Sequence, residues 1–237
     1  AVIILYHSFY KLAQGLSMSS AQPAITEFTP GLDHFMERLK TIYQAMDKAY
    51  DEITAYYGCS CAGCDGNCCT SYFFHYTVAE YLYLAKGFQA LRPERQNELR
   101  RLAREFVGER DRLEAEGKKI DLMCPLNDRG LCGLYAFRPM ICRLHGVPHS
   151  YRRPDLALVR GEGCPKLVPP VIDAPGRVVD ASGHTIEKPA RRELDRSRFY
   201  RDLAMLEQEL RQEIGFGERI KMTIADMITS MEKEENP

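Results

Sequence analysis

The distribution of cysteines constrains this chain more than any other feature of its sequence. Nine cysteines lie between Cys59 and Cys164 of a 237-residue chain, and five of them lie between Cys59 and Cys69. The number is odd, and Cys68 and Cys69 are adjacent. Disulfide frameworks are typical of short secreted domains with an even number of cysteines, so they fit this pattern poorly. The pattern instead predicts metal-binding thiolates in a reducing compartment, and we expect a cytoplasmic location.

The cysteines form two sets. The first set has the spacing Cys61-x2-Cys64-x3-Cys68-Cys69, with small residues between the thiols that allow the backbone to fold tightly around a metal. A Cys-x2-Cys pair also occurs in thioredoxin-like redox proteins, but no βαβ pattern surrounds this one. Cys59 is supernumerary, and the two sets together predict eight metal ligands: Cys61, Cys64, Cys68, Cys69, Cys124, Cys132, Cys142 and Cys164.

The adjacent pair Cys68-Cys69 limits the kind of metal site. In extended backbone successive side chains point to opposite faces, so neighbouring thiols rarely bind one mononuclear ion together. They can more easily serve different metal atoms. This favours an iron–sulfur cluster, or two close sites with interleaved ligands, over two independent four-cysteine zinc sites. Zinc and mononuclear iron are the alternative cofactors.

The cysteine motifs resemble those of a known family. The first set is followed by Cys124-Pro-Leu, by Gly130-Leu-Cys132-Gly-Leu-Tyr and by Arg138-Pro-x2-Cys142-Arg143. This combination is similar to the YkgJ-type cysteine-cluster family, described as a zinc- or iron-chelating domain, over about residues 58–165. The resemblance implies metal chelation by these cysteines. A related cluster occurs in flagellin lysine methylases, which are longer proteins, and this relationship raises a metal-dependent modifying enzyme as an alternative.

Apolar periodicity predicts a mainly α fold, with helices packed around a loop-rich cysteine site and few short strands. Helices are expected over 32–57, 77–91, 93–116, 191–214 and 218–235, with Thr29 and Pro30 starting the first. Residues 120–170 are rich in Gly and Pro and predict mostly loop, with short strands at 156–160 and 178–179. We expect an extension and linker over 1–30, the metal-binding domain over 31–170, and a linker and helical pair over 171–237. A hairpin of the second and third helices would bring the two cysteine sets together.

Several residues near the cysteines are candidates for supporting roles. Arg138 and Arg143 flank Cys142, and their guanidinium groups could offset thiolate charge through hydrogen bonds or simply shape the turn. The aromatic run after Cys69 could exclude water from a cluster or form ordinary core. His75, inside that run, is predicted to be a core histidine and not a ligand.

Charge and motifs exclude several function classes. With 32 Lys and Arg against 33 Asp and Glu, nothing indicates nucleic-acid or anionic-membrane binding. No run of about 18 apolar residues predicts a membrane span. No phosphate loop, hydrolase or radical-SAM motif occurs, so catalytic residues cannot be assigned. We predict a metal-binding protein for electron transfer or sensing, or alternatively a zinc module for protein interaction.

An apolar stripe in the last predicted helix predicts core packing or a homodimer. The stripe consists of Ile220, Ile224, Met227, Ile228 and Met231.

Overall fold

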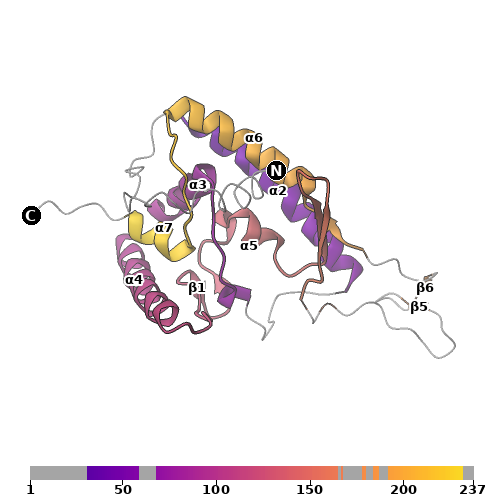
Figure 1. Cartoon of the computed structure of the whole chain (residues 1–237), viewed down its shortest axis with the longest axis horizontal. Coiled ribbons are helices and arrows are strands. Elements are labelled where there is room, and N and C mark those ends of the chain that lie inside the picture. The colour runs from indigo at the N-terminus through magenta and orange to yellow at the C-terminus, as the bar shows by residue number, and fades with distance from the viewer. Residues whose placement is uncertain are drawn as a thin grey trace, which may run out of the picture. The chain divides into compact units, whose positions relative to one another are not determined.

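The computed structural model describes residues 31–58, 68–164, 167, 178–179, 184–186 and 192–231. Within these residues the chain forms six α-helices, two 3-10 helices and seven strands of two to four residues (Figure 1). The predicted mainly α fold is therefore confirmed. The predicted helix start at Thr29 and Pro30, and the N-terminal extension, lie outside the described residues.

The chain divides into two compact units that are interleaved along the sequence. The first unit contains the described parts of Lys40–Cys64 and Met140–Met205. The second contains the described parts of Leu16–Leu39, Asp65–Pro139 and Leu206–Pro237. Two helices have residues in both units: α2 (Asp33–Tyr56) and α6 (Ser197–Ile214).

The core of the second unit lies around α3 (Val78–Gln89), where ten of its twelve residues are buried. The helix begins where the Thr77 hydroxyl accepts a hydrogen bond from the backbone N–H of Glu80. The carboxylate of Glu207, from α6, accepts two more from Val78 and Ala79 at 2.8 and 2.9 Å. A carboxylate at this end satisfies two orphan donors and complements the helix dipole.

Helix α4 (Pro93–Ala115) is largely solvated, and only Leu99 and Ala103 are buried. Its mixed charges pair along the surface, as in Arg101–Glu105 at 2.6 Å. The main partner of α4 is α7 (Ile224–Ser230), which lies beside it (Figure 1). The predicted apolar stripe is used for this packing, because Ile220, Ile224, Met227 and Ile228 are all buried. A homodimer through this helix stays a prediction.

Both C-terminal helices begin later than the sequence predicts, and for the same physical reason. Residues Leu194–Asp195 form β7 before α6 starts at Ser197. Met222 exchanges backbone hydrogen bonds with His75, at 2.7 and 3.0 Å, before α7 starts at Ile224. In each case extended backbone is paired with a distant segment, so the helical pattern cannot continue through it. Helix α7 also ends at Ser230, short of the predicted residue 235.

The Gly- and Pro-rich stretch contains more regular structure than expected. In the second unit it forms β1 (Asn127–Asp128), β2 (Leu131–Cys132) and the 3-10 helix η2 (Tyr135–Phe137). In the first unit it forms α5 (Met140–Leu144), β3 (His149–Arg152) and β4 (Leu158–Gly161). These two strands join β7, from outside the stretch, in a sheet of order β4-β3-β7. β3 pairs antiparallel with β4 and parallel with β7. Strands β5 (Val178–Val179) and β6 (Thr185–Ile186) form a separate pair.

Candidate metal centre

The second unit joins the two predicted cysteine sets through the backbone. Cys68 and Cys69 lie in the 3-10 helix η1 (Cys68–Thr70). The backbone N–H of Cys124 donates to the carbonyl of Cys69 at 3.0 Å. The predicted meeting of the two sets therefore occurs at these residues. A tight pairing of α3 with α4 does not bring it about, because α4 packs chiefly on α7.

A two-residue hairpin places Cys132 near Cys124. Arg129 and Gly130 have φ values of 50° and 89°, which form the tight turn between β1 and β2. The register pairs Cys132 with Asn127, three residues beyond Cys124. The backbone N–H of Gly133 then donates to the carbonyl of Leu126 at 2.7 Å. The chain thus returns Cys132 to the segment that carries Cys124.

The surroundings of Cys124 keep its thiol protonated. Burial, together with negative charge on Cys69 and Cys132, raises the pKa of the Cys124 thiol to about 12. The backbone N–H of Leu126 donates to the Cys124 sulfur and acts in the opposite direction. The Cys124 thiol therefore resists deprotonation in the absence of a cation. A bound metal ion reverses this situation, because it binds thiolates and displaces their protons.

The adjacent cysteines differ in their surroundings. Cys68 is exposed, whereas Cys69 is half-buried. The two side chains of this pair therefore do not share one environment. That neighbouring thiols serve different metal atoms stays a prediction.

The first unit holds Cys142 and Cys164, both half-buried. Cys142 lies on α5, and the backbone N–H of Cys164 donates to the carbonyl of Gly146 at 2.7 Å, just after that helix. Gly163 has φ +80° and packs on the backbone of Val147 and Pro148, where a Cβ would approach to 2.6 Å. Close backbone packing therefore fixes Cys164 beside the end of α5.

The two predicted arginines have different surroundings. Arg143, which is 5% exposed, pairs with Asp47 at 2.6 Å and lies over the ring of Tyr43. Arg138 lies over the ring of Tyr135, 3.5 Å from its centroid, and its Nε donates to the carbonyl of the same residue. A role of either side chain toward thiolates stays a prediction. Nothing in the sequence distinguishes Asp47 from the other four acids of α2.

A second buried arginine, Arg196, was not predicted. Its Nη2 donates to the carbonyl of Leu144, the last residue of α5. Burial lowers the pKa of Arg196, and contact with Tyr200 acts in the opposite direction. Burial and then the positive charges of Arg196 and His149 lower the pKa of His145. The C-terminal end of α5, the helix that carries Cys142, is therefore buried and electropositive.

His75 lies in the core, as predicted. The side chain is 3% exposed, its Nε2 has no partner within the part of the chain that the structure describes, and burial lowers its pKa to about 4. Its neighbour Phe74 packs edge-on against Tyr72.

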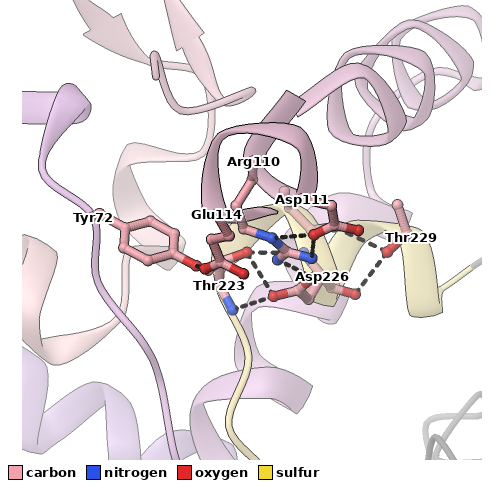
Figure 2. A network of polar contacts seen from close by, with 8 residues as sticks. Tyr72, Arg110, Asp111, Glu114, Thr223, Asp226 and Thr229 are labelled. Atoms are coloured by element: carbon pink, nitrogen blue, oxygen red, sulfur yellow. Dashed lines mark hydrogen bonds and ion pairs between the residues drawn. The ribbon is translucent and has the colours of Figure 1, made fainter. Parts of the chain in front are cut away.

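A polar network anchors the segment after Cys69. The Tyr72 hydroxyl donates to Glu114 on α4 at 3.2 Å, and burial followed by the Glu114 charge raises the pKa of Tyr72 to about 12. On the same helix, Arg110 pairs with Asp226 of α7 at 2.7 Å (Figure 2). The Asp226 carboxylate also accepts from Thr223 in a capping box. This network fixes η1, α4 and α7 within the second unit.

The described residues do not by themselves complete a ligand set. Among them, no group of three or more Cys, His, Asp and Glu side chains has the geometry of a finished metal site. Cys59, Cys61 and Cys64 lie outside the described residues. The donor chemistry nevertheless fits zinc or iron, because the backbone brings Cys69, Cys124 and Cys132 to one segment and a backbone N–H already donates to the Cys124 sulfur.

Two further findings bear on function. None of the described helices has the length and apolar character needed to span a bilayer. Residues 60–162 match the family model CxxCxxCC, whose description is "Putative zinc- or iron-chelating domain". No curated protein and no solved structure matches the chain.

Proposed function

We propose that the protein holds a thiolate centre with more than one metal atom. The premise is the match of residues 60–162 to the family model of a zinc- or iron-chelating domain. An iron–sulfur cluster is the occupant we favour. Such a cluster supplies one-electron chemistry, which suits electron transfer or sensing. The eight cysteines Cys61, Cys64, Cys68, Cys69, Cys124, Cys132, Cys142 and Cys164 are its proposed ligands, with Cys59 outside the set.

One observation carries this proposal: the backbone N–H of Cys124 donates to the carbonyl of Cys69, and the β1–β2 hairpin returns Cys132 to the same segment. The Cys124 thiol is buried, and burial together with charge on Cys69 and Cys132 raises its pKa. A buried thiol with no cation tends to stay protonated and inert, so the arrangement favours a bound cation. The different exposure of Cys68 and Cys69 supports more than one metal atom.

The decisive experiment is metal analysis of protein purified without oxygen. We expect brown protein that contains iron and acid-labile sulfide in comparable amounts, with a broad visible absorption band that bleaches on reduction. Colourless protein with stoichiometric zinc and no sulfide would rule out the iron–sulfur cluster.

Two serine substitutions test the ligand assignment. Cys132→Ser removes a proposed ligand at the hairpin, and we expect the metal content to fall by at least half. Cys59→Ser is the matched control, because this thiol is supernumerary, and we expect its metal content to equal that of the unmodified protein. Equal loss in both variants would contradict the ligand set.

A structural zinc module is the second candidate, and the conformation of residues 120–139 favours it. This stretch contains two-residue strands and one short 3-10 helix, so a metal could supply much of its folding energy. The zinc module predicts that a chelator unfolds the stretch and that the protein shows no redox change. A reversible redox change with the fold retained would contradict it.

A further inference from the structure

The first unit contains a buried positive charge that none of its described acids balances. Arg196 is 3% exposed and follows β7 directly. Its Nη2 donates to the carbonyl of Leu144, and its buried Nε has no hydrogen-bond partner. Throughout the described part of the chain, no Asp or Glu side chain forms an ion pair with it. The groups that face it are His145, Tyr151 and Tyr200, and none of them supplies an ordinary negative charge.

In the same unit, Arg143 is a buried arginine whose charge is balanced by a carboxylate. It is buried to a similar degree, and it has the carboxylate of Asp47 at 2.6 Å. Burying a guanidinium without a counter-charge is costly, because neutral dipoles replace its hydration only in part. The carbonyl at the end of α5 and the Tyr200 hydroxyl are such dipoles. Arg196 therefore lacks an anion that Arg143 possesses.

The position of Arg196 indicates which anion this is. The carbonyl that it contacts belongs to Leu144, and Cys142 lies two residues earlier on the same helix. The backbone N–H of Cys164 donates to the carbonyl of Gly146, two residues after Leu144, so both described cysteines of the first unit belong to the segment that Arg196 contacts. A divalent ion held by four thiolates carries an excess of about two negative charges, so a centre containing Cys142 would be an anion on this segment.

We propose that Arg196 is the internal counter-charge of the thiolate metal centre to which Cys142 contributes, and that its unbalanced charge makes metal loading more favourable. The inference rests on the proposed function. Arg196 acts as a positioning and charge-balancing residue and does not itself bind the metal. Without metal the guanidinium opposes folding of the first unit, and with metal it stabilises the bound thiolates. The same side chain therefore has opposite effects on the two states.

The test compares metal-free and zinc-loaded protein for the variant Arg196→Met, which removes the charge and keeps an apolar side chain of similar reach. We expect the urea midpoint of the metal-free variant to equal or exceed that of the unmodified protein. We expect its zinc dissociation constant, measured by chelator competition, to rise about tenfold, which is about 1.4 kcal/mol. Equal loss of stability in both states with unchanged zinc affinity would overturn the proposal and leave Arg196 as a cap of α5.

Two further variants make the result specific. Arg196→Lys keeps the charge but loses the fork of donors, so its zinc affinity should stay within about threefold of the original. A tenfold loss of zinc affinity in the Lys variant would overturn the proposal, including the case in which the Met variant does not fold. Arg211→Met is the matched control, because Arg211 is paired with Glu207. It should lower the stability of both states equally and leave zinc affinity unchanged. Failure of the unmodified protein to bind zinc or iron would instead overturn the proposed function, and the counter-charge with it.

Discussion

At the scale of single residues, the environment of His75 has a measurable consequence for stability. Burial lowers its pKa to about 4, against about 6.5 for an unfolded histidine. Between these values the folded state binds fewer protons than the unfolded state, so the free energy of unfolding falls as the pH is lowered from about 6.5 to about 4. The full effect is about 3 kcal/mol.

The variant His75→Phe should remove this pH dependence. We expect it to match the unmodified protein near pH 7 and to be more stable near pH 5, in urea titrations across a pH series. The exposed His34 offers a control, and His34→Gln should leave the pH profile unchanged. A profile of His75→Phe that parallels the original would show that His75 does not titrate on unfolding.

At the scale of elements, a carboxylate from α6 holds the start of α3. Glu207 accepts from two backbone N–H groups there, and we expect Glu207→Gln to lower the free energy of unfolding by about 1–2 kcal/mol. Glu209→Gln, two residues along the same helix, is the control. Glu209 forms an exposed, solvent-screened pair with Arg38, so its loss should cost less than the loss of Glu207. Urea denaturation of the two variants measures the difference, and equal effects would contradict the capping role.

The contact between α3 and η2 requires glycine at position 87, because the ring of Phe137 packs against it. A Cβ at Gly87 would lie 2.3 Å from Cγ of Phe137, so Gly87→Ala must displace that ring. We expect a loss of about 1–3 kcal/mol in thermal or urea unfolding. Gly108→Ala on α4 is the matched control. Nothing lies within 4 Å of a Cβ there, and it should stabilise the protein by about 0.5–1 kcal/mol.

At the scale of the whole molecule, the interleaving of the two units limits how the chain can be divided. The matched stretch 60–162 contains α4 but lacks α7, which covers the apolar side of α4. It also lacks β7, the parallel partner of β3. We therefore expect residues 60–162 expressed alone to unfold without cooperativity, as measured by circular dichroism. A cooperative transition like that of the full chain would contradict this.

The sequence predicts those parts of the fold that depend on local pattern. The helix over Asp33–Tyr56 was predicted to within one residue at each end, because its apolar period is long and unbroken. Helix α6 was predicted six residues too early, because Leu194 and Asp195 pair with a strand about 45 residues away. Such pairing depends on tertiary contacts that a local pattern does not contain.

The same distinction applies to the candidate site. The cysteines could be identified because their spacing is itself the signal. Arg196 and Asp47 could not, because their importance comes from burial and from the partner that each has or lacks. A buried arginine has the same appearance in a sequence as a solvated one. The sequence indicates Arg138 and Arg143 only because they lie close to Cys142 along the chain.

The parallel pairing of β3 with β7 also sets an order of events during synthesis. The backbone contacts that gather Cys69, Cys124 and Cys132 need only residues 68–133. The pairing of β3 with β7 cannot form until Asp195 has left the ribosome, 45 residues after its partner Ser150. At about 5–20 residues per second this is a delay of about 2–9 s. In a nascent chain the thiols of the second unit would thus be accessible to metal before Arg196 has been synthesised.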